Sequence, residues 1–121
     1  MRKAFVWLLG ALSVTLLAAC APSSDPVGDV SKGPARGDAL DLTIRDGAFD
    51  PTTIELDPGA EVTVEVTNDD DTAHDFAIEE IGLNTGTIEP GEVATATFEA
   101  PNEATEFACT FHSGMTGRIV P

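Results

Sequence analysis

Basic residues are scarce in this chain of 121 residues: six Lys and Arg stand against 21 Asp and Glu, and the formal net charge is −15. Nucleic-acid binding by counterion release requires clustered Lys and Arg, whereas these six are scattered along the sequence. The composition therefore argues against a nucleic-acid partner. Two explanations of the acidity stay open, a solvated surface suited to a salt-rich habitat and a surface that attracts a basic protein.

Charged residues are absent from positions 4–19, an apolar stretch that follows two basic residues. A basic start followed by an apolar run of about fifteen residues is typical of a secretory signal, and it is slightly short for the roughly 20 residues of a membrane-spanning helix. The run ends in Leu17-Ala18-Ala19-Cys20, which resembles the lipobox of bacterial lipoproteins. We therefore predict an extracytoplasmic protein, periplasmic or on the outer face, held at the membrane by lipid on Cys20. An uncleaved membrane helix is the alternative.

Regular structure is disfavoured between Ala21 and Asp38, because Pro, Gly, Ser and Asp dominate this stretch. A flexible coil of about 18 residues spans roughly 24 Å, enough to hold a small domain off a membrane surface. The sequence therefore predicts three parts: a signal peptide at 1–19, a lipidated N-terminus and flexible tether at 20–38, and one folded domain at 39–121.

Helical periodicity is missing beyond residue 39, where no apolar stripe extends over more than about two turns. Apolar and polar residues instead alternate in the stretches 40–44, 62–66 and 94–98, and turn-forming Pro, Gly, Asn and Asp separate them. Alternation with period two is typical of half-buried strands. We predict an all-β, antiparallel β-sandwich of seven or eight short strands around one core.

Thiols are few, because Cys20 and Cys109 are the only cysteines. With Cys20 assigned to lipid, Cys109 has no partner for an intramolecular disulfide. A lone thiol in an oxidising compartment needs an explanation: it is buried, paired with another molecule, or bound to a metal.

Histidine and methionine are equally scarce, with two of each in the chain. Cys109, His112 and Met115 follow one another at intervals of three residues, and the other histidine, His74, precedes an apolar stretch at 76–81. Singly, each side chain has an ordinary explanation as a core residue or an exposed imidazole. Together, a thiolate, two imidazoles and a thioether suit copper in both oxidation states, whereas zinc gains little from a thioether. We predict one copper ion at these four residues.

The spacing Cys109-x2-His112-x2-Met115, followed by Thr116-Gly117-Arg118-Ile119-Val120, resembles the copper loop of the cupredoxins, in the amicyanin and plastocyanin branch. The resemblance covers about residues 40 to 121. It implies a Greek-key β-sandwich and a type 1 blue-copper site in which His74, Cys109 and His112 form a trigonal plane and Met115 is a long axial contact. The upstream residues that follow the family pattern are Phe49-Asp50-Pro51, Ile54, Pro58-Gly59, Val62 and Asn68.

Two residues depart from the family pattern. Ala73 stands where Pro commonly precedes the first histidine, and Asp75 stands where Asn usually follows it. In the family that Asn bonds to the residue after the cysteine, here Thr110. Asp75 can accept the hydroxyl proton of Thr110, and its negative charge favours Cu(II). We therefore expect a lower reduction potential than in an Asn variant.

The resemblance implies a membrane-tethered electron carrier that cycles between Cu(I) and Cu(II), and not an enzyme. Multicopper oxidases and copper nitrite reductases share the sandwich but need more histidines than the two present here. His112 beside Phe111 resembles the surface patch through which such carriers exchange electrons, although Phe111 also fits the edge of a core. We expect a monomer and a redox partner protein such as a basic cytochrome or oxidase domain. A copper carrier that delivers its metal is the alternative.

A run of three acids, Asp69 to Asp71, precedes His74. It lacks the alternating spacing and the closing Glu of a calcium-binding loop. We therefore interpret it as a solvated turn.

Overall fold

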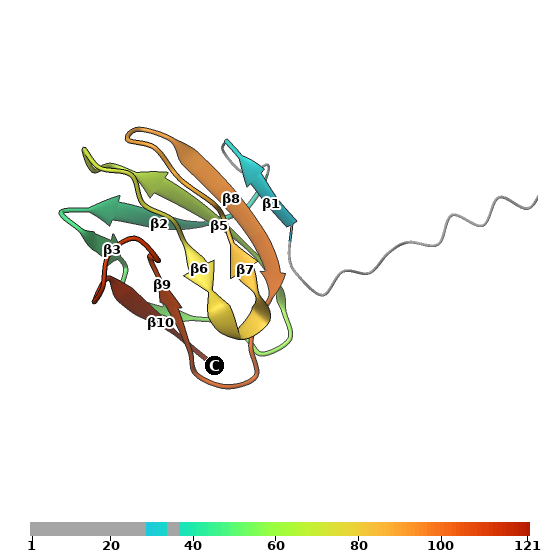
Figure 1. Cartoon of the computed structure of the whole chain (residues 1–121). Coiled ribbons are helices and arrows are strands. Elements are labelled where there is room, and N and C mark those ends of the chain that lie inside the picture. The colour runs from blue at the N-terminus through green and yellow to red at the C-terminus, as the bar shows by residue number, and fades with distance from the viewer. Residues whose placement is uncertain (1–28, 34–36) are drawn as a thin grey trace, which may run out of the picture.

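The computed structural model describes residues 29–33 and 37–121 (Figure 1). The predicted signal peptide at 1–19 and the predicted lipidation site Cys20 lie outside the described residues. In the part of the chain that is described, no helix is long and apolar enough to cross a membrane.

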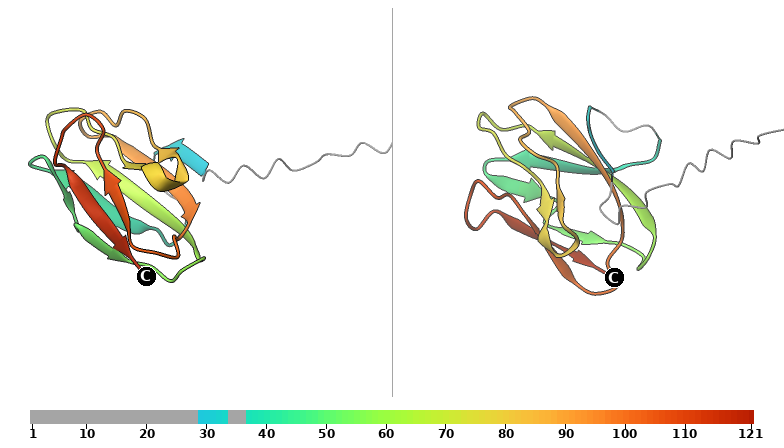
Figure 2. Two further views of the ribbon diagram at one scale, coloured as in Figure 1. Left: turned by 60° about the horizontal axis from the view of Figure 1, so that its bottom comes forward. Right: turned by 45° about the vertical axis from the view of Figure 1, so that its right-hand side comes forward.

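Within the described residues, ten strands form two five-stranded sheets, which face each other as the two layers of a sandwich (Figure 2). In spatial order, the first sheet contains β1 (Asp29–Lys32), β8 (Val93–Glu99), β5 (Glu61–Asn68), β2 (Leu40–Arg45) and β3 (Ala48–Asp50). The second sheet contains β4 (Thr53–Glu55), β10 (Thr116–Val120), β9 (Thr105–Ala108), β6 (Ala77–Ile78) and β7 (Leu83–Asn84).

The alternating stretches form strands as predicted, and each turns one side toward the core. β2 buries Leu42 and Ile44, and β5 buries Val64 and Val66, while the intervening residues are more exposed. The only helical element among the described residues is the single 3-10 turn η1 (Glu79–Ile81). The all-β sandwich is therefore confirmed, and its architecture is consistent with the Greek key.

The sheets are mixed, so the expectation of a purely antiparallel sandwich is wrong. β2 runs parallel to β5, and β4 runs parallel to β10. The strand count exceeds seven or eight because several elements are only two to four residues long. Pairing between strands that are distant in sequence has no local signature, whereas the alternation within each strand does.

Strand β1 lies inside the stretch 20–38, where we predicted only a tether. It pairs antiparallel with the edge of β8, in the register Asp29↔Thr97 to Lys32↔Ala94. Beyond it, Gly33 donates its N–H to the carbonyl of Val93 at 2.8 Å. The prediction that this stretch contains no regular element is therefore wrong at residues 29–32.

Three aromatic rings fill the core between the sheets. The ring centroids of Phe49 and Phe107 are 5.1 Å apart, those of Phe76 and Phe107 are 5.3 Å apart, and those of Phe49 and Phe76 are 6.1 Å apart. The two pairs that include Phe49 pack edge to face, a geometry that stabilises a core beyond the burial of area alone. Phe76 and Phe107 each stand two residues from a predicted metal ligand, so the cluster fixes the backbone at the end of the first ligand loop and at the start of the second.

Candidate metal centre

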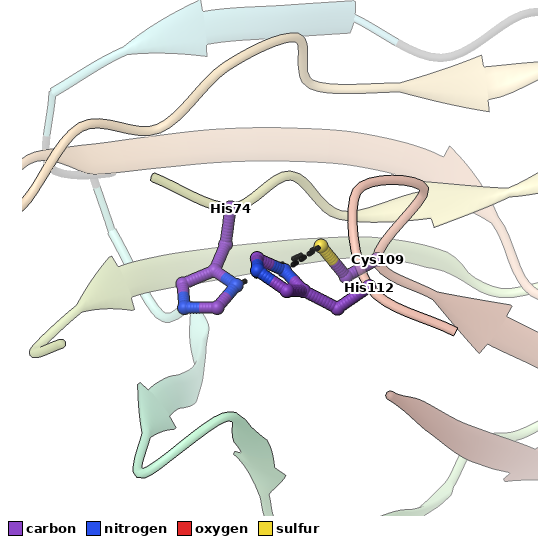
Figure 3. A group of neighbouring side chains, drawn as sticks. All are labelled: His74, Cys109 and His112. Carbon is purple, nitrogen blue, oxygen red and sulfur yellow. Dashed lines mark hydrogen bonds between the residues drawn. The ribbon is translucent and has the colours of Figure 1, made fainter. Parts of the chain in front are cut away.

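Three side chains from two loops converge at one end of the sandwich. His74 lies in the connection after β5, Cys109 directly follows β9, and His112 lies on the loop before β10. The Sγ of Cys109 is 3.7 Å from the Nδ1 of His74 and 3.7 Å from the Nδ1 of His112. Figure 3 shows the thiol and both imidazoles pointing toward one another, and one donor atom from each lies within 4.8 Å of the others.

These distances fit a single metal ion between the three donors. Bonds of about 2.3 Å to sulfur and about 2.05 Å to nitrogen, the lengths found for zinc, set roughly 120° apart, place the two donors about 3.8 Å from each other. The observed 3.7 Å is close to that value. Sulfur with two imidazole nitrogens is also the donor set that suits copper. These three residues therefore fit the copper ion that the sequence implies.

The loop to His74 is shaped by the buried side chain of Asn68, which ends β5. Its amide donates to the carbonyls of Thr72 and Ile88, both at 2.8 Å, and its carbonyl accepts the N–H of Asp70 at 3.0 Å. Such bonds from an Asn side chain to nearby backbone define a turn. His74 then exchanges two backbone hydrogen bonds with Ile88, at 3.1 and 2.7 Å. The imidazole is thereby held at a fixed position, with 1% of the residue exposed.

The second loop is closed by backbone hydrogen bonds across its base. Cys109 donates its N–H to the carbonyl of Met115 at 3.0 Å, and Met115 donates to the carbonyl of His112 at 3.3 Å. Gly114 supplies the positive φ of 81° that the turn requires. Cys109 and Met115 are each 4% exposed and belong to the same core cluster. The fourth predicted ligand therefore lies on the loop that carries the other two.

The two loops are joined through Asp75. Its carboxylate accepts the N–H of Thr110 at 2.6 Å, the hydroxyl of Thr110 at 2.5 Å and the amide N–H of Asn84 at 3.1 Å. The hydroxyl bond expected from the sequence is present, and the backbone bond adds a second. Asp75 is 1% exposed, so its charge is buried one residue from His74 and against the residue after Cys109.

Asp70 is a site residue that the sequence analysis missed. Its Oδ2 is 2.9 Å from the Nε2 of His74 and accepts the N–H of Gly47 at 2.9 Å. The hydrogen bond with His74, then that with Gly47, lowers the pKa of the Asp70 carboxyl to about 2. Its side chain is 15% exposed, so the interpretation of Asp69 to Asp71 as a solvated turn is wrong for Asp70. The signal in the sequence for this contact was an acid four residues before a histidine.

The outer side of the site is open to solvent. His112 is exposed, and the adjacent Phe111 is 51% exposed. Among residues 29–33 and 37–121, Phe111 is the one large hydrophobic residue that is exposed. Phe111 therefore does not belong to the core, which was the alternative explanation for it. The two residues predicted to form an electron-transfer patch are both exposed and are adjacent in the second loop.

Comparison with solved structures finds the same fold in amicyanin and auracyanin. A reduced variant of amicyanin superimposes with a TM-score of 0.60 and 14% identity, covering 75% of this chain and 96% of amicyanin. Dithionite-reduced auracyanin from Roseiflexus castenholzii gives a TM-score of 0.60 and 19% identity, covering 71% of this chain and 98% of auracyanin. No curated protein matches the sequence.

A family model describes nearly the whole chain. The model for the cupredoxin-like domain matches residues 9–120. This match agrees with the two-layered sandwich and with the loop that carries Cys109, His112 and Met115. The chain therefore belongs to the cupredoxin-like domain family.

Proposed function

We propose that this protein is an electron carrier with one type 1 copper ion held by His74, Cys109 and His112, with Met115 as a weak axial ligand. The placement of the Cys109 Sγ at 3.7 Å from the Nδ1 of both histidines is the observation that supports this most directly. When bound, copper would supply a one-electron couple, because sulfur favours Cu(I) and imidazole nitrogen accepts Cu(II).

The protein contributes a donor set whose geometry is fixed in advance. Asn68 and the Ile88 bridge hold His74, and backbone hydrogen bonds across the base of the second loop hold Cys109 and Met115. A rigid set of this kind limits rearrangement when an electron is gained or lost. Four protein donors also leave no open position for a substrate, unlike catalytic metal sites, which supports a carrier and not an enzyme.

Electrons would pass through the exposed edge of His112 beside Phe111. A small apolar patch lets a partner approach closely without displacing tightly bound water. The rest of the surface carries the strongly negative charge of the chain, with a formal net charge of −15. Electrostatic steering therefore favours a basic redox protein, such as a cytochrome or an oxidase domain.

Copper delivery is the alternative function. A delivery protein must release its metal, and release is easiest when the ligands are accessible. Here His74 is 1% and Cys109 4% exposed, which supports retention of the metal.

A visible spectrum of the purified full chain after addition of Cu(II) tests the proposal. An electron carrier turns intensely blue through thiolate charge transfer, cycles reversibly and retains its metal against a chelator. Cys109→Ser removes the colour, while Ser113→Ala on the same loop retains it. A pale protein that prefers Cu(I) and yields it to the chelator contradicts electron transfer and supports delivery.

We also propose that lipid on Cys20 tethers the domain outside the cytoplasm. Strand β1 begins nine residues after Cys20, and nine extended residues reach about 32 Å at most. Asp29 pairs with Thr97 near the end of β8, whereas the ligand loops lie near the start of β8, where Asn68 bonds to Glu92. The chain thus enters the domain at the end opposite His112, so the patch would face away from the membrane. Lipid labelling and membrane attachment, both lost in Cys20→Ser, test the tether.

A further inference from the structure

Asp70 is held in place before any metal binds. Its carboxylate accepts N–H groups from Gly47 at 2.9 Å and from Asp71 at 3.1 Å, in addition to its contact with the Nε2 of His74 at 2.9 Å. Its own N–H donates to the side chain of Asn68 at 3.0 Å. A side chain with this many fixed partners has one orientation.

The support for Asp70 comes from the turn after the neighbouring strand β2, whose end lies beside the end of β5 in the pairing Ile44↔Asn68. Arg45 pairs with Ala48, so Asp46 and Gly47 form a two-residue hairpin turn between β2 and β3. Both have positive φ, 52° and 69°, as a type I′ turn requires, and Asp-Gly is a favoured sequence for that turn. The N–H of Gly47 is thereby directed at Asp70 by a rigid local structure.

The contact determines which nitrogen of His74 carries the proton. A carboxylate only accepts hydrogen bonds, so the imidazole must donate Nε2–H to Asp70. Thr72 Oγ1, at 3.2 Å from the same nitrogen, is able to accept as well. Nδ1, which faces the Cys109 sulfur at 3.7 Å, is then left with its lone pair free. Metal binding through Nδ1 requires this tautomer.

We propose that Asp70 is a positioning residue, which fixes His74 in the Nε2–H tautomer and orients its Nδ1 for metal binding. Histidines that bind metals commonly donate their second N–H to a carboxylate or carbonyl, and loss of such a partner typically lowers metal affinity about 10- to 100-fold. The inference rests on the proposed role of His74 as a ligand. The hairpin turn at Gly47 thereby becomes part of the metal site, although it touches no ligand itself.

His112 provides an internal comparison within the same site. Its Nδ1 also faces the Cys109 sulfur at 3.7 Å, but the residue is exposed, and its Nε2 has no hydrogen-bond partner in the described part of the protein. We therefore expect the tautomer of His112 to be set by solvent, and that of His74 to be set by Asp70.

Nitrogen-15 spectra of the metal-free full chain near neutral pH test the proposal, because they distinguish a protonated ring nitrogen from a bare one. The expected result is Nε2–H at His74. Asp70→Ala removes the carboxylate that accepts Nε2–H, so His74 should lose its single tautomer. The matched control is Asp69→Ala, since Asp69 pairs with Arg45 at 2.7 Å and not with His74.

Zinc affinity gives the second measurement, with Zn(II) as a redox-inert probe. Asp70→Ala should weaken Zn(II) binding about 10- to 100-fold, and Asp69→Ala should leave it unchanged. Asp70→Leu, which also lacks an acceptor, replaces Asp70→Ala if that variant does not fold.

The proposal is overturned by Nδ1–H or an even tautomer mixture at His74 in the unsubstituted chain. Equal spectra and zinc affinities for the substitutions at positions 69 and 70 overturn it as well. Neither measurement uses copper. A chain with the expected tautomer that never turns blue therefore contradicts the proposed function alone.

Discussion

The carboxylate of Asp75 accepts two hydrogen bonds from Thr110, one from its N–H at 2.6 Å and one from its hydroxyl at 2.5 Å. The pair joins the loop of His74 to the loop of Cys109 and His112. An Asn side chain makes one of these bonds equally well, because its carbonyl accepts an N–H. The second bond, from the hydroxyl of Thr110, would change in an Asn variant. There a neutral amide group would replace the buried, charged oxygen that accepts this bond.

Asp75→Asn should therefore raise the reduction potential. A unit charge about 10 Å from the metal at an effective dielectric constant near 20 stabilises the more positive oxidation state by roughly 1.7 kcal/mol, or about 70 mV. Voltammetry of the copper-loaded protein measures the shift. Asp71→Asn is the control, because Asp71 is an exposed acid in the same connection between β5 and β6. Equal potentials for Asp75→Asn and the unsubstituted chain would exclude a role for the charge.

Removal of the metal should leave the sandwich folded. The core cluster is built from side chains of both sheets, and the three donors are already grouped within 4.8 Å. Binding then stabilises the native state by mass action, by about 4 kcal/mol when free metal exceeds the dissociation constant roughly 1000-fold. Denaturation curves with and without added metal measure the gain, and Cys109→Ser should show much less of it. A metal-free chain without a cooperative transition would show instead that metal is required for folding.

Replacement of Phe111 by Ser, which removes the apolar side chain without adding charge, should slow electron exchange with a basic cytochrome without altering the copper site. Phe111 is 51% exposed, so the substitution costs little stability. Rates of association vary by about one to three orders of magnitude among variants of one interface. Stopped-flow mixing measures the rate, and the visible spectrum and potential serve as internal controls. Phe111→Leu, which retains an apolar side chain, should be affected less. A rate unchanged in Phe111→Ser would place the docking surface elsewhere.

The alternation of β2, β5 and β8 was predictable because each strand buries every second residue against one core. The convergence of His74, Cys109 and His112 followed from the scarcity of these residue types. Strand β1 was not predictable, because Asp29–Lys32 has no alternating pattern and is defined by its pairing with β8. Asp70 was missed because its function depends on the loop formed by Asn68 and on the turn at Gly47, which is distant in sequence.

A chain that begins at Gly37 should fold with reduced stability. It lacks β1, so it loses the pairing with β8 and the partly buried Val30 that packs against the core. The expected loss is about 1–2 kcal/mol, from partial burial of one Val and a few hydrogen bonds. It also exposes the edge of β8, which favours association through unpaired strands. Denaturation and sedimentation compare it with a chain that begins at Asp29. Equal stability and equal mass for the two chains would mean that β1 contributes nothing.

The strand that follows the metal loop depends on Gly117, which lies directly opposite Phe107 in the pairing of β10 with β9. The Phe107 ring lies over this glycine, and a Cβ at position 117 would come within 2.1 Å of its Cζ. Because Phe107 is fully buried against Phe49 and Phe76, the ring has no free space to enter.

Gly117→Ala should consequently destabilise the fold by about 1–3 kcal/mol or more, the cost of overpacking a core. Thr116→Ala, at the exposed neighbouring position, is the control. Phe107→Leu combined with Gly117→Ala should lose less stability than the sum of the two single changes, because a smaller side chain leaves room for the added methyl group. Denaturant unfolding of the four proteins measures this coupling. Additive losses would show that the Phe107 ring does not limit the packing at position 117.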